Sequence, residues 1–234
     1  MIESLQNKHV KELTILKTAK GRKETGLFIV EGRHLVEEAK ALGILVKAYT
    51  IDEALEGKMV SRDVMKKLCN TDTIVNQIGV CKKLEAKELS NNILILDGVQ
   101  DPGNLGALMR SAKAFDFNTI FLGNGTVDPY NDKVIRASQG AIFKLNIIEG
   151  NIIDFINSLK NYDIYSTNVV NGISVDTIKK STHQALILGN EGNGVSKEVQ
   201  NLNLKNLYIK MSNMESLNVS VAGSILMYEM TKQA

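Results

Sequence analysis

The segment from residue 91 to 116 constrains the fold more than any other, because it joins an apolar strand, a glycine-rich turn and a helix. The strand is the run NNILIL, and the helix is the run LGALMRSAKAF. The turn between them, DGVQDPG, contains Pro102, one of only two prolines in the chain. Such a unit usually builds a phosphate or nucleotide site, but these glycines match neither the P-loop nor the dinucleotide-binding fingerprint.

Strands and helices continue to alternate after this segment. Because parallel strands need a helical crossover between them, the alternation predicts a parallel sheet with helices on both faces. The expected strands lie at 93–97, 119–122, 162–166, 185–189 and 206–210, and the expected helices at 104–116, 129–138, 151–159, 195–201 and 216–231.

The first part of the chain has its own, smaller α/β pattern. The run KKLEAKELSNN, which follows it, is polar and charged and is typical of a connector between domains. We therefore predict two domains, residues 1–88 and residues 89–234. In the first domain, helices are expected at 4–18, 32–42 and 61–69, and strands at 26–30, 44–50 and 74–82.

Composition indicates an ordinary globular protein, with 44% hydrophobic and 23% charged residues. The first residues lack the apolar core of a signal peptide, and no apolar run is long enough to span a bilayer. The two cysteines are too few for a disulfide framework, and the three histidines are scattered. We expect a cytoplasmic protein that has no membrane contact and needs no metal.

The charge distribution suggests that docking and chemistry are separated. Residues 1–90 carry 16 Lys and Arg against 13 Asp and Glu, whereas residues 91–234 carry 12 against 13. A basic amino-terminal arm would suit docking to an acidic partner, although a solvated surface helix would have the same composition. Lys8, Lys17, Lys20, Arg22, Lys23 and Arg33 are the basic residues that the family resemblance described below makes candidate RNA contacts.

The turn around Pro102 places small and functional side chains on one helix. Gly103, Gly106 and Arg110 fall on one stripe, which predicts a bare surface that a substrate backbone can approach while the guanidinium reaches across it. Asn104 can cap the helix or bind a ligand. The alternative is a simple turn with a solvent-facing arginine.

Two further loops have unusual composition and follow expected strands. LILGNEGNGVS places Glu191 among glycines, where a carboxylate would repel a pyrophosphate, although a flexible hairpin turn is the alternative. In the run ESLNVSVAGSILMYEM, Ser216 and Asn218 can cap a helix or bind a ligand. That helix would have an apolar face (Leu217, Val221, Ile225, Tyr228) and a small-residue face (Ser216, Ser220, Gly223, Met227) that allows another backbone to approach.

Together the three loops resemble the motifs of the SpoU (TrmH-like) family of RNA ribose 2′-O-methyltransferases, in the SPOUT superfamily. NLGALMR resembles the first motif, LILGNEGNGVS the second and ESLNVSVA the third, over roughly residues 92–232. SLQNKHVKEL and FIVEGRHLVEEA are similar to the small ribosomal-protein-like RNA-binding domain that many members carry. The resemblance implies a parallel sheet with a carboxyl-terminal trefoil knot, a homodimer, and S-adenosylmethionine as the methyl donor.

The resemblance also implies site residues. Arg110, Asn104, Glu191, Ser216 and Asn218 match the positions around the target ribose, and we expect Arg110 to grip a neighbouring phosphate and to stabilise negative charge on the attacking oxygen. The proton acceptor is expected to be Glu191 or water. The implied cofactor pocket consists of Thr167, Asn168, Leu188, Gly189, Asn190, Gly192, Ile209, Met211 and Leu217.

The third motif departs from the family's pattern. Lys210 and Asn213 stand where members usually have proline and glycine, and the segment before Glu215 is one residue shorter, which affects the expected floor of the cofactor pocket. The expected substrate is RNA, because only RNA offers a 2′-hydroxyl, and the extra amino-terminal domain favours ribosomal over transfer RNA. The alternatives are a transfer RNA 2′-O-methyltransferase, a non-catalytic RNA-binding protein of the same fold, and an unrelated nucleotide-binding enzyme.

Overall fold

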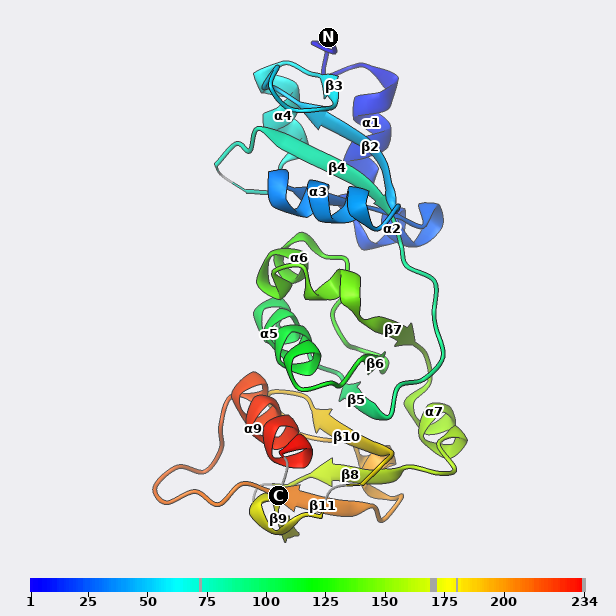
Figure 1. Cartoon of the computed structure of the whole chain (residues 1–234), viewed down its shortest axis with the longest axis vertical. Helices are drawn as coiled ribbons and strands as arrows, with labels where there is room; N and C mark the ends of the chain where they lie inside the picture. The colour runs from blue at the N-terminus through cyan, green and yellow to red at the C-terminus, as the bar shows by residue number, and fades with distance from the viewer. Residues whose placement is uncertain (72, 169–171, 180, 233–234) are drawn as a thin grey trace. The chain divides into compact units, whose positions relative to one another are not determined.

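The computed structural model describes residues 1–71, 73–168, 172–179 and 181–232 (Figure 1). The chain forms two compact units. One comprises Met1–Leu84 together with Tyr130–Arg136, and the other comprises Glu85–Pro129 and Ala137–Ala234. The amino-terminal unit therefore includes a short segment from later in the chain than its predicted end at residue 88. None of the described helices is both long enough and apolar enough to cross a membrane.

The amino-terminal unit is built on a four-stranded sheet of order β1-β4-β2-β3, in which β4 runs antiparallel to β1 and β2. Val10 and Leu13 of helix α1 pack with Val64 and Leu68 of helix α4 in the core of this unit. The elements are α1 (Lys8–Ile15), α2 (Ala19–Thr25), β1 (Leu27–Glu31), α3 (Arg33–Ala41), β2 (Leu45–Thr50), β3 (Lys58–Met59), α4 (Arg62–Leu68) and β4 (Gln77–Lys82).

The helix predicted at 4–18 is in fact shorter, and a second helix that we did not predict follows it. The chain turns after α1, and Thr18 starts α2 by accepting a hydrogen bond from the amide of Gly21. Glycine is required there, because a Cβ on Gly21 would lie 2.2 Å from the carbonyl oxygen of Ile15. Gly26, at φ +67°, ends α2 in the left-handed region that favours glycine.

The carboxyl-terminal unit contains a seven-stranded sheet of order β7-β6-β5-β10-β8-β11-β9, and each neighbouring pair is parallel. The predicted parallel α/β fold is therefore confirmed. A strand β10 that lies between β5 and β8 agrees with the knot implied by the resemblance, and the knot itself stays a prediction. The strands are β5 (Asn92–Asp97), β6 (Thr119–Leu122), β7 (Asn146–Glu149), β8 (Asp163–Thr167), β9 (Ile173–Ser174), β10 (Gln184–Gly189) and β11 (Lys205–Tyr208).

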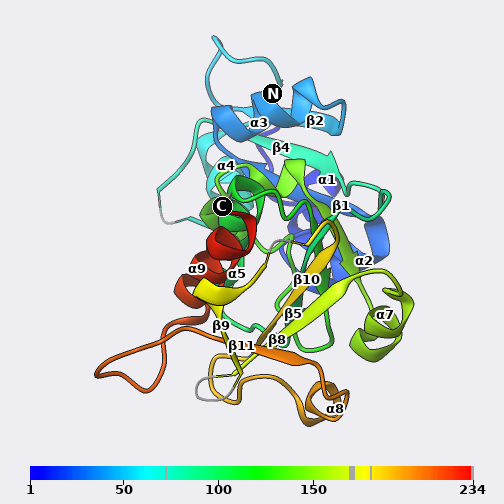
Figure 2. The same cartoon turned by 60° about the horizontal axis from the view of Figure 1, so that its bottom comes forward.

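Helices cover both faces of this sheet, as Figure 2 shows for α5 and α9 on one side and α7 and α8 on the other. Ile156 of α7 and Val199 of α8 pack against Ile93 and Ile187 of the central strands. The α-helices of this unit are α5 (Pro102–Ala114), α7 (Ile152–Ser158), α8 (Lys197–Gln200) and α9 (Val219–Thr231), with short 3₁₀ turns at Ala141–Lys144 and Val175–Thr177. Most of helix α6 (Asp132–Ser138) belongs to the segment assigned to the amino-terminal unit.

Small residues allow α5 and α9 to pack closely within the chain. A Cβ on Gly223 would lie 2.5 Å from Leu188 and 2.6 Å from Leu108, and the hydroxyls of Ser111 and Ser224 are hydrogen-bonded at 2.7 Å. The small-residue face of α9 therefore contacts its own chain. The prediction that Gly106 leaves a bare surface for a substrate is wrong, because Gly106 is buried and a Cβ there would lie 2.3 Å from that of Ala137.

Candidate active site

The three motif loops meet through the carboxylate of Glu191. Its oxygens accept hydrogen bonds from the backbone amides of Gln100 (3.1 Å) and Asp101 (3.0 Å) and from Nδ2 of Asn104 (3.1 Å). Asn104 Oδ1 in turn accepts a hydrogen bond from Nδ2 of Asn218 at 2.9 Å. Side chains separated by 87 and 114 residues are thus linked at the carboxyl ends of parallel strands, where doubly wound sheets collect their ligands.

Asn218 is the last side chain in this hydrogen-bonded row, and it also caps α9. Its Oδ1 accepts hydrogen bonds from the backbone amides of Ser220 (2.9 Å) and Val221 (3.3 Å), so the helix begins at Val219 rather than at the predicted residue 216. An ionised carboxylate can only accept hydrogen bonds, so the side chains of Asn218 and Asn104 must each donate toward Glu191. Asn104 must turn its amide nitrogen to Glu191 and its oxygen to Asn218.

Asp101, not Asn104, caps the first helix. The Asp101 side chain accepts a hydrogen bond from the backbone amide of Asn104 at 2.8 Å, and Pro102 occupies the first turn of α5, where its missing N–H is no loss. Asp101 was missed in the sequence, although aspartate directly before proline is a strong helix-start signal. The capping leaves the Asn104 side chain available for Glu191 and Asn218.

Hydrogen bonding keeps Glu191 ionised. Desolvation by partial burial acts to raise the pKa of Glu191, but the hydrogen bonds from the Asn104 side chain and from the Asp101 and Gln100 amides outweigh it. The pKa of this carboxyl is therefore lower than its ordinary value. With a longer contact from Asn190 Nδ2 (3.5 Å), the carboxylate accepts four hydrogen bonds, and a carboxylate so bonded and with a lowered pKa is a poor proton acceptor.

The loop after β10 is folded tightly by its own residues. Asn190 Oδ1 accepts hydrogen bonds from the amides of Gly192 (3.0 Å) and Asn193 (3.1 Å), and Asn190 Nδ2 donates to the carbonyl of Gly98 (2.8 Å). Gly189 is required for this turn, because a Cβ there would lie 2.1 Å from the carbonyl carbon of Gly194. The second motif is thus an ordered turn that is bonded to the loop after β5.

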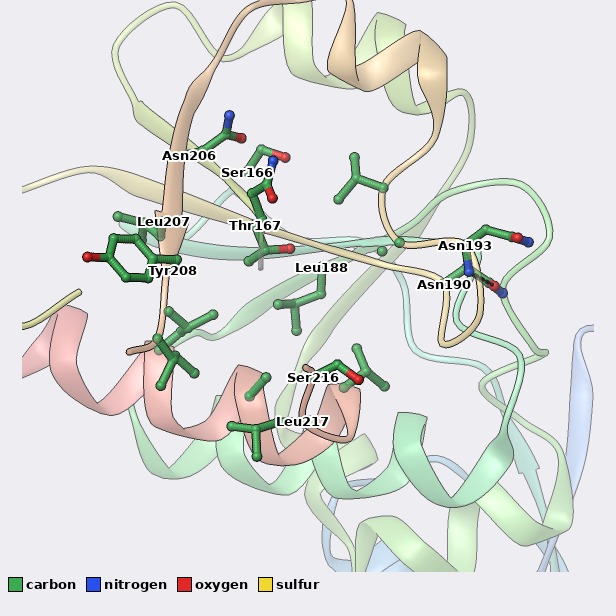
Figure 3. Close-up of a pocket in the computed structure, with 18 of the residues that line it drawn as sticks. Ser166, Thr167, Leu188, Asn190, Asn193, Asn206, Leu207, Tyr208, Ser216 and Leu217 are labelled. Atoms are coloured by element: carbon green, nitrogen blue, oxygen red, sulfur yellow. Dashed lines mark hydrogen bonds between the residues drawn. The ribbon is translucent and has the colours of Figure 1, made fainter. Parts of the chain in front are cut away.

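A cavity of about 960 Å³ lies beside this junction and is lined from β8, β10, β11 and the start of α9. In Figure 3, Ser216 and Leu217 beside α9 lie across the cavity from Thr167 of β8, and Asn190 and Asn193 form a third side. Each of the residues predicted to bind the cofactor lines it: Thr167, Asn168, Leu188, Gly189, Asn190, Gly192, Ile209, Met211 and Leu217. Residues 169–171 of the predicted loop STNVVNG lie outside the described residues.

The lining combines amides and hydroxyls with apolar side chains. Glu191 is the one charged side chain among the described lining residues, and no cation lines the cavity. This composition does not suit a phosphate, but it fits a ligand with apolar and hydrogen-bonding parts and a positive centre. The sequence reasoning missed Ser166, Asn193, Asn206 and Tyr208, which line the same cavity. The available signal was that Ser166 and Tyr208 lie near the carboxyl ends of β8 and β11, and that Asn193 lies in the glycine-rich loop after β10.

Arg110 lies apart from this lining. It is exposed on α5, and among the described residues no side chain or carbonyl forms a hydrogen bond or ion pair with it. Of the five residues predicted around the ribose, Glu191, Ser216 and Asn218 line the cavity, and Asn104 reaches it through its hydrogen bonds. The guanidinium therefore remains available for a group outside this chain.

The predicted RNA contacts of the amino-terminal unit divide into four kinds among the described residues. Arg22 is only 5% exposed and donates a hydrogen bond to the carbonyl of Leu16, so its assignment to RNA is wrong. Lys17 donates to the carbonyls of Lys67 (3.2 Å) and Cys69 (2.8 Å) at the end of α4. The exposed pairs Lys8–Glu12, Lys20–Glu24 and Arg33–Glu37 are ion pairs one helical turn apart, and Lys23 is exposed without such a partner.

Solved structures share this architecture. An AdoMet-bound rRNA methyltransferase from Sinorhizobium meliloti superposes with a TM-score of 0.85 at 27% identity, covering 98% of this chain and 96% of that one. The SpoU methyltransferase AviRb from Streptomyces viridochromogenes, in complex with AdoMet, superposes with a TM-score of 0.81 at 19% identity, over 97% of each chain, and this shows the fold alone. The fold and the cavity define a SPOUT-class methyltransferase.

Sequence comparison identifies the family within this class of methyltransferases. Residues 91–228 match the model of the SpoU rRNA Methylase family, and residues 7–79 match the MRM3-like substrate binding domain. The 23S rRNA (guanosine(2553)-2'-O)-methyltransferase RlmP of Bacillus subtilis is 37% identical over 98% of both chains. The chain belongs to the SpoU rRNA methylase family.

Proposed function

We propose that this protein transfers a methyl group from S-adenosylmethionine to a ribose 2′-hydroxyl of ribosomal RNA. The observation that carries the proposal is the junction of Glu191, Asn104 and Asn218 beside the cavity, in a chain that is similar over nearly its whole length to a 23S ribosomal RNA 2′-O-methyltransferase. A transfer RNA substrate is the alternative, and the separate RNA-binding-type unit at the amino terminus favours ribosomal RNA.

The cavity residues would bind and orient the donor. S-adenosylmethionine supplies a methyl group on a positively charged sulfur, and the carbon–sulfur bond breaks as the ribose oxygen attacks. A sulfonium centre suits a cavity whose described lining has a carboxylate and no cation. The main task of the protein is then to hold the ribose oxygen in line with the methyl carbon.

Asn104, Ser216 and Asn218 would orient the ribose, and Arg110 would grip the neighbouring phosphate. Because a guanidinium is always protonated, Arg110 stabilises negative charge on the attacking oxygen rather than taking its proton. The lowered pKa of Glu191 favours water over this carboxylate as the proton acceptor. The unpaired, exposed position of Arg110 leaves its five N–H donors available for RNA.

A homodimer through the exposed face of α9 is part of the proposal. Leu217, Val221, Ile225 and Tyr228 form an apolar stripe at helical spacing, with each side chain between 37% and 48% exposed. The opposite face of α9 is already packed against α5 and β10. A continuous exposed apolar stripe is typical of a protein interface, and a second copy of the chain would cover it.

Mapping of ribose methylation in cells tests the function. Ribosomal and transfer RNA from cells with and without the gene would be compared for 2′-O-methyl groups at each nucleotide. The proposal expects the loss of one or a few sites in ribosomal RNA, with return of the site when purified protein and S-adenosylmethionine are added to the unmodified RNA. Loss confined to transfer RNA would select the alternative, and an unchanged map would contradict both.

A further inference from the structure

The helices of the amino-terminal unit differ in how they pair their exposed charges. On α1, α2 and α3 a cation faces a glutamate one turn later, in the pairs Lys8–Glu12, Lys20–Glu24 and Arg33–Glu37. Opposite charges at this spacing stabilise a helix, and like charges destabilise it. These pairs therefore neutralise Lys8, Lys20 and Arg33, whereas Lys11 of α1 and Lys23 of α2 are exposed without a side-chain partner among the described residues.

Helix α4 has exposed cations that form no such pair. Arg62 and Lys66, four residues apart, are both exposed, and Lys67 is exposed beside Lys66. None of the three side chains forms a hydrogen bond or ion pair among the described residues. Asp63, the one acidic residue on α4, precedes Lys67 by four residues without forming an ion pair with it, and it lies in the first turn, where a negative charge suits the helix dipole.

Lys17 adds a further positive charge at the end of this helix. Its Nζ donates to the carbonyls of Lys67 and Cys69, so the ammonium group lies at the carboxyl end of α4. The partial negative charge at the carboxyl end of a helix attracts a cation, which explains the position of the Lys17 ammonium group. It does not explain Arg62 and Lys66, two like charges on adjacent turns, an arrangement that a bound anion would make favourable.

We infer that the outer face of α4, formed by Arg62, Lys66 and Lys67, is the surface on which this protein binds the phosphate backbone of its RNA. An exposed arginine and lysine on adjacent turns can bind one phosphate from two sides, or two neighbouring phosphates of one strand. This inference rests on the proposed function, because it takes ribosomal RNA as the ligand. It moves the RNA contacts from the paired cations of α1, α2 and α3 to the unpaired cations of α4.

The test compares two double variants that remove the same charge. Arg62→Gln with Lys66→Gln removes the unpaired cations, and Lys8→Gln with Lys20→Gln removes two exposed cations that already have glutamate partners. Binding of each protein to an unmethylated in vitro transcript of large-subunit ribosomal RNA is measured at several KCl concentrations. Thermal melting confirms that each variant is folded, as expected for exposed positions.

Counterion release gives the expected size of the effect. Each phosphate contact contributes roughly 0.7 to 0.9 to the slope of log affinity against log salt, so the α4 variant should lose about 1.4 to 1.8 of slope and roughly 25- to 60-fold in affinity at 0.1 M salt. The Lys8 and Lys20 variant should change much less. An unchanged slope for the α4 variant, or an equal loss in both variants, would overturn the inference.

Methyl transfer separates this inference from the proposed function. The α4 variant should raise the KM for RNA while kcat and the affinity for S-adenosylmethionine stay at wild-type values, because α4 contributes no residue to the cavity. If the wild-type protein binds the transcript through α4 but transfers no methyl group to it, the binding surface stands and the proposed function fails. If methyl transfer is normal and does not depend on α4, the proposed function stands and the inferred RNA-binding surface fails.

Discussion

The substitution Glu191→Gln distinguishes a residue that holds the loops from one that takes the proton. In the wild-type structure Oε1 accepts from Asp101 N and Asn104 Nδ2, and Oε2 accepts from Gln100 N and, at 3.5 Å, from Asn190 Nδ2. A glutamine can retain only one acceptor oxygen, so with that oxygen in the Oε1 position its amide nitrogen would face two N–H donors. The variant should therefore lose the bond from Gln100 and the longer one from Asn190, together with the charge that strengthens the other two.

The size of the loss follows from these bonds. A hydrogen bond contributes about 0.5–1.5 kcal/mol net, and the exposure of Glu191 keeps each contribution low, so we expect the variant to lose about 1–2 kcal/mol. For a protein of this size that corresponds to a fall in Tm of roughly 2–8 °C. If the same free energy is lost from the stabilisation of the transition state, kcat/KM should fall about 5- to 30-fold.

The assay is methyl transfer from radiolabelled S-adenosylmethionine, followed as a function of pH. We expect the reduced rate of Glu191→Gln to keep the pH profile of the wild type. The exposed Glu198, which has no hydrogen-bond or ion-pair partner among the described residues, provides a matched control as Glu198→Gln. A loss of about 10²–10⁴-fold together with the disappearance of the acid limb would refute this reasoning and make Glu191 the proton acceptor.

The stability of the same variant should depend on pH with a defined sign. The folded state lowers the pKa of Glu191, so the ionised form stabilises the fold. That contribution is complete above the ordinary glutamate pKa of about 4.3 and is lost as the pH falls through the lower folded value. The difference in the free energy of unfolding between wild type and Glu191→Gln, measured by urea titration, should be present at pH 7 and shrink below about pH 4.

Three further substitutions test the rest of the site. Arg110→Ala should abolish methyl transfer while calorimetry shows nearly unchanged affinity for S-adenosylmethionine, and near-wild-type turnover would contradict the assigned role. Gly189→Ala should abolish donor binding, because its Cβ would overlap the backbone at 2.1 Å, whereas Gly192→Ala meets nothing closer than 3.6 Å and should retain binding. Val221→Glu with Ile225→Glu should convert the proposed dimer to a monomer in sedimentation experiments, and an unchanged mass would exclude the α9 interface.

The convergence of the site was predictable from the sequence, because it follows from topology. Parallel strands end at the same edge of a sheet, so loops after β5 and β10 must lie close together, and a strand–helix alternation reveals which loops these are. Asn104 and Glu191 could be placed near each other on this basis. The resemblance to known motifs added Asn218 and the identity of the ligand.

The detailed bonding was not predictable. Which side chain caps a helix and which binds a neighbouring loop depends on local geometry that the sequence does not show, and Asp101 rather than Asn104 proved to be the cap. Helical spacing cannot distinguish a glycine that exposes a surface from one that packs against a neighbour, which explains the error at Gly106. Charge counting likewise treats Arg22 as solvated, although a carbonyl of its own chain binds it in the core.

The shorter elements were missed for a different reason. Strands β3 and β9 have two residues each, so neither is long enough to show a periodic pattern. Strand β7 was missed as well, although β6, which also has four residues, was predicted. They are ordered by neighbouring strands that were already predicted. Local sequence does not contain that information.

The row from Glu191 through Asn104 to Asn218 has a thermodynamic consequence for variants that combine substitutions. Each member satisfies the next, so the removal of one leaves its neighbour in the row short of a hydrogen bond. Free-energy penalties at these three positions should fall well short of additivity in a double-mutant cycle, with the second replacement adding little to the first. The side chains of Glu191, Asn104 and Asn218 would then contribute to stability as one cooperative unit.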